Sequence, residues 1–202
     1  MHPERRAMKL VILDRDGTLN ANSEAFVQSP EAWTPLPGAL EAIARLNHAG
    51  FHVVIASNQS GLGRGLFDMA SLNIIHARLH KQLAAVGGRV EAVFFCPHAA
   101  DEGCTCRKPQ PGLLQQIGER LGVELAGVPL AGDGVRDMQA AVAAGCEPHL
   151  VLTGKSASLA DQPLPPEFPP QTRVHRDLGA FADFLIARSA PSTRAPRPDP
   201  SA

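Results

Sequence analysis

The chain has 202 residues, which fits one globular domain, and 44% of them are hydrophobic, enough for a sizeable buried core. The formal net charge is −1, aromatic residues are few, and no long basic run precedes the C-terminal tail, so the composition argues against a nucleic-acid-binding surface. The N-terminal segment has no apolar stretch long enough for a signal peptide or a membrane span. We therefore expect a monomeric, cytoplasmic enzyme with no nucleic-acid or membrane partner.

The predicted sheet begins with an apolar strand that runs directly into two aspartates. The segment Leu10–Leu13 is typical of a strand buried on both faces of a parallel sheet, and Asp14 and Asp16 follow it. Two carboxylates at the rigid end of such a strand can share a divalent cation and still offer one oxygen for attack. This pattern predicts phosphoryl-transfer chemistry.

The irregular stretch from Asp14 to Pro37 is far longer than a usual connection of about four to six residues, which indicates a functional loop.

Helix-like and strand-like segments then alternate along the chain. We predict helices over 38–49, from the N-cap Asp68 to Gly87, over 111–122, over 132–145 and over 177–188. The apolar face of the second of these consists of Met69, Leu72, Ile75, Leu79 and Leu83. Further strands are predicted over 51–56, 90–95, 128–131 and 149–152.

This alternation predicts a doubly wound, mostly parallel, Rossmann-like α/β sheet with helices on both faces. We expect one domain over residues 9–188 and a flexible N-terminal extension over 1–8. From residue 189 the composition becomes Pro, Ser, Arg and Ala without periodicity, so residues 189–202 are expected to form a disordered tail.

Polar residues suited to phosphate chemistry follow the predicted strands, where ligands of such folds bind. These residues are Asp14, Asp16, Ser57, Arg107, Lys108, Asp133 and Asp137. The aspartates and the serine have structural alternatives, because Asp also suits turns and helix caps and a serine in a tight turn often bonds only its own backbone. Their joint occurrence at one edge of the sheet favours an active site.

Three of the four cysteines lie within the segment 96–106. In a chain without an export signal, this crowding favours a metal site over a disulfide framework, although free thiols or a strained disulfide are alternatives. The fourth, Cys146, lies in an Ala-rich stretch and is interpreted as a small buried hydrophobic residue.

Four ordered motifs resemble those of the haloacid dehalogenase superfamily of phosphatases. They are Asp14-x-Asp16-Gly-Thr-Leu-Asn, Ser57-Asn-Gln, Lys108-Pro and Gly-Asp133-x-x-x-Asp137. The resemblance implies that Asp14 attacks the phosphorus and becomes an aspartyl phosphate, and that Asp16 acts first as acid and then as base. It also implies that Ser57 and Lys108 bind the transferring oxygens.

The same resemblance implies a magnesium ion. Its ligands would be the Asp14 carboxylate, the Asp16 backbone carbonyl and Asp133. Asp137 would orient the metal, a water molecule or Lys108 from outside the ligand set.

The segment Cys96-Pro-His98-x5-Cys104-x-Cys106-Arg107-Lys108-Pro is similar to the zinc loop of the D-glycero-D-manno-heptose 1,7-bisphosphate 7-phosphatases and of the histidinol-phosphatases. Three thiols and one imidazole complete a tetrahedral Zn²⁺ site with no position left for a catalytic water, so this zinc would be structural. Its binding would rigidify the loop that aims Arg107 and Lys108 at the substrate.

The resemblance also implies which loops select the substrate, because the chain has no insertion large enough for a cap domain. The residues expected to contact the sugar are Asn22, Phe26, Asn58, Gln59, Ser60 and Arg107. Gly134 departs from the polar or basic residue often found at this position in the family, which puts one substrate contact in doubt.

The function implied is removal of the C7 phosphate from D-glycero-D-manno-heptose 1,7-bisphosphate, a sugar bisphosphate, in the synthesis of ADP- or GDP-heptose. A histidinol-phosphatase with the same machinery is the first alternative. A noncatalytic zinc-binding interaction module is an alternative of another class, disfavoured by the presence of both Asp14 and Asp16.

Overall fold

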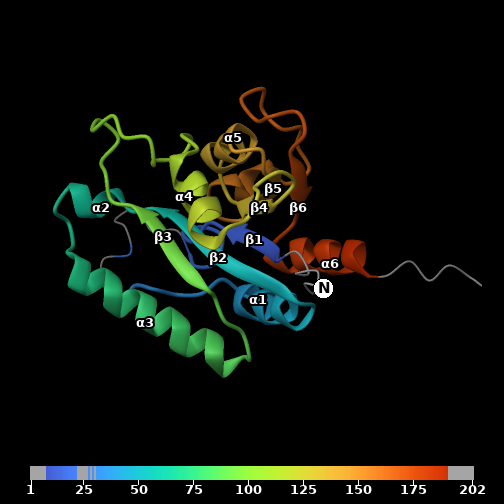
Figure 1. Ribbon diagram of the computed structural model, residues 1–202, viewed down its shortest axis with the longest axis horizontal. Helices are drawn as coiled ribbons and strands as arrows, with labels where there is room; N and C mark the ends of the chain where they lie inside the picture. Colours follow the sequence, from blue (N-terminus) through green and yellow to red (C-terminus); the bar gives the residue numbers. More distant parts are fainter. Residues whose placement is uncertain (1–7, 22–26, 28, 30, 191–202) are drawn as a thin grey trace, which may run out of the picture.

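The computed structural model describes residues 8–21, 27, 29 and 31–190. Its framework is a six-stranded sheet with the order β3-β2-β1-β4-β5-β6, in which every strand pair is parallel (Figure 1). The strands are β1 (Lys9–Leu13), β2 (Phe51–Asn58), β3 (Ala92–Cys96), β4 (Pro129–Gly132), β5 (Glu147–Val151) and β6 (Arg173–His175). This order confirms the predicted doubly wound α/β fold. The point at which the strand order reverses, where ligands of such folds bind, lies between β1 and β4.

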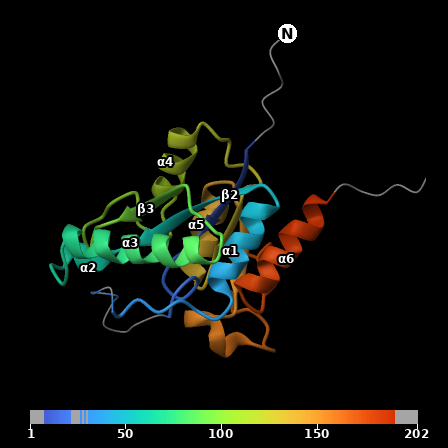
Figure 2. The same cartoon turned by 90° about the horizontal axis from the view of Figure 1, so that it is seen from below.

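Helices cover both faces of the sheet (Figures 1 and 2). One face carries α1 (Ala39–His48), α3 (Met69–Ala85) and α6 (Leu178–Ser189), and the other carries α4 (Gly112–Leu121) and α5 (Val135–Ala143). The one-turn helix α2 (Ser60–Gly63) and the 3₁₀ helix η1 (Gly154–Leu159) belong to connecting loops. Within the described residues no separate folded unit interrupts this arrangement, as predicted for a phosphatase without a large cap domain.

The central strand β1 is held from both sides. Val11 and Leu13 are fully buried in the hydrophobic cluster under α1, α3 and α6, whereas Leu10 and Ile12 are buried in the cluster under α4 and α5. Because its side chains alternate between the two cores, the strand is packed on both faces of the sheet. The residues that follow Leu13 therefore start from a rigid support.

The predicted elements are confirmed with shifts of at most three residues at their ends. The largest shift at a helix start is in α5, which begins at Val135 and not at Gly132. Asp68 and Asp177 cap α3 and α6 by accepting hydrogen bonds from the backbone of Ser71 and Ala180. The inclusion of Met69 in the buried face of α3 was wrong, because its first-turn position leaves it 46% exposed.

Three short elements were not predicted. β6 has only three residues, none of them fully buried, so it lacks the apolar pattern of a strand. Helices α2 and η1 consist mainly of glycine, serine and other small residues that favour turns.

The prediction of flexible terminal segments concerns residues that lie mostly outside the described part of the chain. It stays a prediction, as does the single-domain boundary at residue 188. Helix α6 continues to Ser189. None of the helices among the described residues is both long and apolar enough to cross a membrane.

Candidate active site

A cleft of about 550 Å³ opens at the carboxyl edge of the sheet, over the end of β1. This volume lies within the range of small-molecule sites, about 300 to 1,000 Å³. Loops after β2 and β3 form one side of the cleft and loops after β4 and β5 form the other. The polar residues that line it are Asp14, Asp16, Ser57, Asn58, Ser60, Arg64, Arg107, Lys108, Arg136, Asp137 and Lys155.

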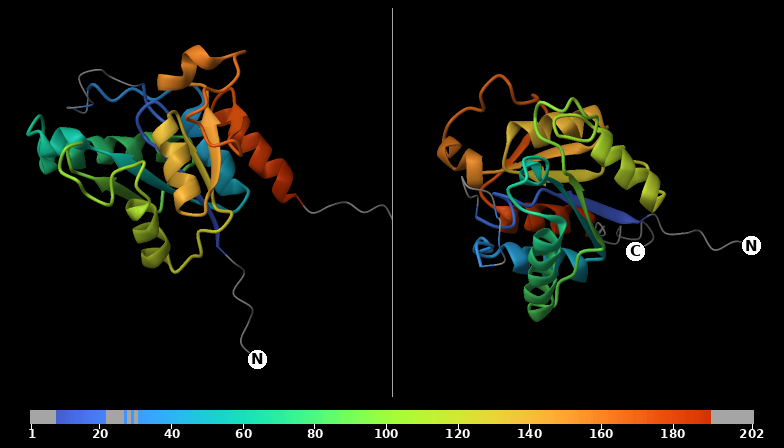
Figure 3. Two further views of the ribbon diagram at one scale, coloured as in Figure 1. Left: turned by 90° about the horizontal axis from the view of Figure 1, so that it is seen from above. Right: turned by 90° about the vertical axis from the view of Figure 1, so that its left-hand side faces the viewer.

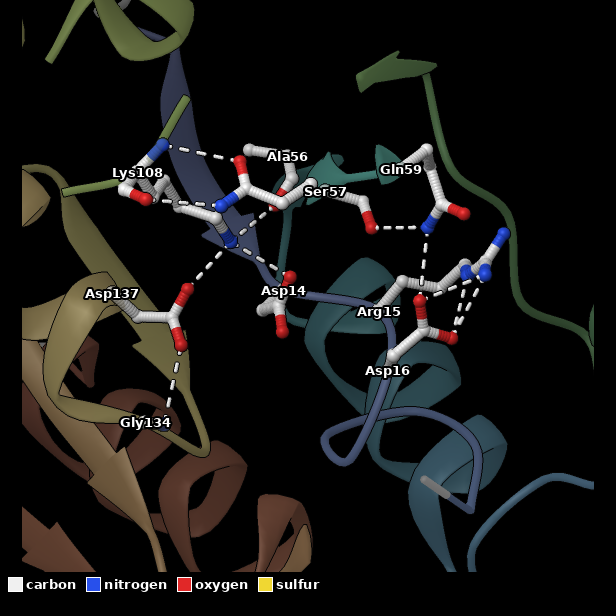
Figure 4. A network of polar contacts seen from close by, with 10 residues as sticks. Asp14, Arg15, Asp16, Ala56, Ser57, Gln59, Lys108, Gly134 and Asp137 are labelled. Carbon is white, nitrogen blue, oxygen red and sulfur yellow. Dashed lines mark hydrogen bonds and ion pairs between the residues drawn. The ribbon is translucent and has the colours of Figure 1, made fainter. Parts of the chain in front are cut away.

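Lys108 lies at the floor of the cleft and is 2% exposed. Figure 4 shows the polar contacts of its side chain. Its ammonium group donates to Asp14 Oδ1 at 2.7 Å and to the Ala56 carbonyl oxygen at 2.8 Å, and it lies 2.5 Å from Asp137 Oδ1. The loop after β3 thus brings a cation to the carboxylates after β1 and β4. The predicted link between Asp137 and Lys108 is present, and Asp137 also accepts a hydrogen bond from the Gly134 backbone, as a helix-capping residue does.

The buried charges on this floor shift one another's pKa. Burial raises the pKa of Asp14 to about 7; Lys108 opposes this shift, while Asp137 and Asp133 add to it. Burial would lower the pKa of Lys108, but the Asp137 and Asp14 carboxylates overcome this effect and hold the pKa above its ordinary value. Lys108 is therefore a permanent cation at physiological pH.

Asp16 points away from Asp14 toward a second set of partners (Figure 4). Arg15 donates to it from Nε at 3.0 Å and from Nη2 at 2.8 Å, and Asn20 and Gln59 each donate one more hydrogen bond. Burial would raise the pKa of Asp16, but the Arg15 guanidinium and the hydrogen bonds hold it below its ordinary value. This arrangement fixes the position of the Asp16 carboxylate.

Sequence reasoning missed Arg15. It is fully buried even though it lies between two aspartates at a strand end, and its Nη1 has no hydrogen-bond partner among the described residues. The signal available was the arginine's position beside two carboxylates that its planar guanidinium can pair with.

The last residues of β2 and the turn after it connect the two halves of the site. Ser57 is buried, and its Oγ accepts a hydrogen bond from Gln59 Nε2, which also donates to Asp16. The Asn58 amide makes two hydrogen bonds with the backbone of Lys108, at 3.0 and 3.1 Å. In this structure Asn58 and Gln59 thus position Lys108 and Asp16; their predicted contacts with substrate stay predictions. Ser60 is buried at the cleft wall, where it was expected to face the sugar.

Three carboxylates at this site can hold a cation. Asp14, Asp133 and Asp137 each offer an oxygen within 4.8 Å of the others. Asp133 is fully buried, and its Oδ1 has no hydrogen-bond partner among the described residues. A buried carboxylate oxygen without a partner is costly, and an oxygen-rich set of this kind suits Mg²⁺. The predicted ligand Asp133 therefore fits a divalent cation.

Gly17 is required for this cluster. Its φ is +84°, and a Cβ at this position would lie 2.1 Å from Asp133 Oδ2. Burial raises the pKa of Asp133 to about 6, against the effect of Lys155.

The loop after β5 also reaches the site, which sequence reasoning missed. Thr153 donates from Oγ1 to the Gly17 carbonyl oxygen at 2.7 Å, and the Lys155 backbone N–H donates to Asp133 Oδ2 at 2.8 Å. Figure 3 (left) shows η1 in orange at the end of the molecule where the segment after β1 also lies. Their position in the sequence was the available signal. These residues follow the fifth strand, so they lie at the same edge of the sheet as the residues that follow the first four strands.

The predicted zinc ligands come together at the last residue of β3 and in the loop after it. The candidate ligand atoms of Cys96, His98, Cys104 and Cys106 lie within 4.8 Å of one another. His98 turns its Nδ1 toward Cys106 Sγ at 3.2 Å, and all three cysteines are free thiols. This donor set fits a tetrahedral zinc ion. Cys146 is buried elsewhere, in the core under α4 and α5, as predicted.

Arg107 connects the two candidate metal sites. Its Nη1 donates to the His98 carbonyl oxygen at 3.3 Å, and its side chain lines the cleft, as expected for a residue that contacts the sugar. The other two residues predicted to contact the sugar, Asn22 and Phe26, lie outside the described residues.

Known proteins match this chain closely. Residues 9–128 match the family model described as polynucleotide kinase 3 phosphatase, and residues 105–180 match the model described as HAD-hydrolase-like. A D-glycero-beta-D-manno-heptose-1,7-bisphosphate 7-phosphatase of Bordetella bronchiseptica is 55% identical over 179 residues, which cover 89% of this chain and 98% of the relative. The chain belongs to this phosphatase family. A member from Pseudomonas aeruginosa is 46% identical and covers 88% of this chain and 97% of its own length.

Solved structures of the family share the fold described above. The D,D-heptose 1,7-bisphosphate phosphatase of B. bronchiseptica, complexed with magnesium and phosphate, has a TM-score of 0.84 and 55% identity, covering 90% of this chain and 99% of its own. The corresponding phosphatase of Burkholderia thailandensis has a TM-score of 0.67 and 51% identity, covering 88% and 98%. The predicted membership of the haloacid dehalogenase superfamily is thereby confirmed.

Proposed function

We propose that this protein is a magnesium-dependent phosphatase that removes the C7 phosphate of D-glycero-β-D-manno-heptose 1,7-bisphosphate. The single observation that carries the proposal is the likeness to the Bordetella phosphatase of that name along nearly the whole of its length. The described cleft supports it, because it combines three carboxylates, a buried lysine and four cations at its rim.

Asp14 is the proposed nucleophile. It directly follows the rigid strand β1, and Lys108 holds one of its oxygens at 2.7 Å, which leaves the other oxygen free to attack the phosphorus. Attack forms an acyl phosphate and releases the sugar C7 oxygen, so that one difficult displacement becomes two easier ones. Water then attacks the phosphorus of this intermediate, and Asp14 is regenerated with release of phosphate.

Asp16 is the proposed acid and base. It gives a proton to the departing sugar oxygen and then takes one from the attacking water. Arg15 keeps the pKa of Asp16 low before the substrate binds. The negative charge of the entering phosphate raises the pKa of Asp16, so that Asp16 takes up the proton that it then donates to the sugar oxygen. Arg15, Asn20 and Gln59 hold the carboxylate in place through both transfers.

Ser57 and Lys108 are proposed to bind the phosphoryl oxygens. The Ser57 hydroxyl accepts from Gln59, so its own proton is available for a phosphoryl oxygen. Lys108, oriented by Asp137, compensates the charge that develops on these oxygens.

The proposed magnesium ligands are the Asp14 carboxylate, the Asp16 backbone carbonyl and Asp133. When bound, the ion offsets the repulsion between the nucleophile and the substrate phosphate. Cys96, His98, Cys104 and Cys106 are proposed to hold a structural zinc ion, which orders the loop that carries Arg107 and Lys108.

Asn22, Phe26, Asn58, Gln59, Ser60 and Arg107 are proposed to contact or surround the sugar. We further propose a monomer in the cytoplasm, a reducing compartment in which the three thiols of the cluster remain available for metal binding. The product would enter the synthesis of activated heptose.

The proposal is tested by phosphate release from three substrates with magnesium: the β and the α anomers of the heptose bisphosphate, and histidinol phosphate. We expect the highest kcat/KM with the β anomer and a product that keeps its C1 phosphate, identified by ³¹P NMR. A preference for histidinol phosphate would overturn the proposed substrate but not the proposed phosphatase reaction. The absence of turnover with every phosphate ester would refute the whole proposal.

A further inference from the structure

The rim of the cleft carries positive charge on both sides. Arg64 and Arg107 come from the loops after β2 and β3, and Arg136 and Lys155 come from the segments after β4 and β5. The cation on the floor, Lys108, is already engaged by Asp14 and Asp137. The rim cations are therefore the groups that can meet a second anionic group of a substrate whose reacting phosphate lies on the floor.

Lys155 differs from the other rim cations in how its backbone is held. Its N–H donates to Asp133 Oδ2 at 2.8 Å, and two residues earlier Thr153 Oγ1 donates to the Gly17 carbonyl oxygen. Between them, Gly154 has a φ of +50°, and a Cβ there would lie 2.6 Å from Gly17 Cα. The start of η1 is thus packed directly against the turn that follows the nucleophile, so the backbone of Lys155 is held in place beside the reacting centre.

The side chain of Lys155 extends from this anchor past Gly134. A Cβ added to Gly134 would lie 3.7 Å from Lys155 Cδ and 3.5 Å from Asp137 Oδ2, which are ordinary contact distances. Gly134 has an extended backbone with a φ of −138°, so the backbone does not require glycine there. The absence of a side chain at residue 134 leaves the space along this cleft wall to the lysine.

Lys155 lies close enough to Asp133 for its charge to lower the pKa of that carboxyl, but its ammonium group makes no bond in the described part of the chain. It is an exposed residue, and no ion pair or hydrogen bond of its side chain is present there. Arg107, on the opposite rim, already donates to the His98 carbonyl oxygen. Lys155 therefore combines a fixed base with an ammonium group available to a ligand.

We propose that Lys155 binds the phosphate that stays on the sugar, so that it selects a bisphosphate over a monophosphate. This inference rests on the proposed function, which supplies a substrate with a second phosphate at C1. Such a phosphate carries close to two negative charges at neutral pH, and a charge-assisted bond to an ammonium group is among the stronger polar contacts.

The test compares two substrates that share the C7 phosphate and differ at C1: the heptose 1,7-bisphosphate and the heptose 7-phosphate. The measured quantity is the ratio of their kcat/KM values. In Lys155→Gln, which keeps the backbone bond to Asp133, we expect this ratio to fall by about tenfold or more, a change of about 1.4 kcal/mol per tenfold. In Lys155→Arg, which keeps the positive charge, it should stay within about threefold of the wild-type ratio.

Lys81→Gln is the matched control, because Lys81 is an exposed lysine of α3 that does not line the cleft. An unchanged ratio in Lys155→Gln would overturn the inference. An equal loss with both substrates would also overturn it, because Lys155 would then act on the reacting phosphate. Failure of the proposed function is seen separately, as a wild-type protein that does not hydrolyse the bisphosphate.

Discussion

The ammonium nitrogen of Lys108 lies 2.7 Å from Asp14 Oδ1, a contact that joins the loop after β3 to the end of the central strand. The two residues are 94 positions apart in the sequence. Asp137 holds the same ammonium group from the first turn of α5, the helix that follows β4. One buried cation thus links three loops at the edge of the sheet, and the nucleophile, its metal-binding neighbours and the phosphate-binding lysine depend on one another.

Replacing Lys108 tests this link. In Lys108→Met we expect kcat/KM for the bisphosphate to fall at least about 100-fold, because a positioned donor to the developing phosphoryl charge is lost. Circular dichroism should confirm that the variant is folded. Lys81→Met, on the exposed surface of α3, is the control. Retention of activity within about threefold would contradict the role of Lys108.

Arg15 is predicted to act through Asp16. Lysine at this position keeps the charge but loses the planar fork that bonds both carboxylate oxygens, so Arg15→Lys should lower kcat by about tenfold or more. KM should change by less than about threefold, because Arg15 does not line the cleft. The control is Arg120→Lys, at an exposed position in α4. A lower melting temperature with unchanged kcat would reveal a purely structural role.

The cysteine cluster is predicted to hold one zinc ion per chain. Cys104→Ala should lose zinc, measured by mass spectrometry of the purified protein, and should lower the melting temperature and kcat together, because the loop before Lys108 loses its support. Cys146→Ala removes a buried thiol outside the cluster and should keep the zinc. Equal zinc content in both variants would exclude this ligand set.

Lowering the pH should destabilise the protein, because His149 must then be protonated. This residue is fully buried in β5, and its Nδ1 lies 2.9 Å from His175 Nε2. Burial, aided by the charges of His175 and Arg188 against that of Glu147, lowers the pKa of His149 to about 4. The unfolded chain, with an ordinary pKa of about 6.5, binds the proton more readily, so stability is complete above that pH and falls as the pH drops toward about 4. The loss attributable to this residue is up to about 3 kcal/mol.

Urea unfolding at several pH values in this window checks that prediction. His149→Leu keeps an apolar contact with Phe181 and should weaken the dependence of the unfolding free energy on pH. The exposed His80 of α3 provides the control variant His80→Leu. The prediction is wrong if wild type and His149→Leu lose stability in parallel on acidification.

The sequence was informative where one physical signal dominated. The run Leu10–Leu13 predicted a strand buried on both faces, and Asp14 therefore had to lie at its carboxyl end. The spacing of the cysteines predicted the cluster in the same way. The positions of Lys108 and Asp137 after predicted strands likewise indicated that both lie at the carboxyl edge of the sheet, where they form an ion pair.

What the sequence could not supply was the direction of individual side chains. The position of Arg15 between two aspartates indicates that it can pair with a carboxylate, but not that its side chain folds inward, because an arginine is usually exposed. Asn58 was expected to face the sugar, yet its amide bonds the backbone of a residue 50 positions away. β6 and η1 have no apolar periodicity, so the loop that brings Lys155 to the cleft was assigned no role.

The measurement that most directly tests the central claim is a rapid acid quench of the enzyme with heptose bisphosphate radiolabelled in the C7 phosphate. Our account predicts a transient labelled protein whose label maps to the peptide that contains Asp14, and no labelled protein with Asp14→Asn. Turnover without any labelled intermediate, or wild-type rates in Asp14→Asn, would contradict it.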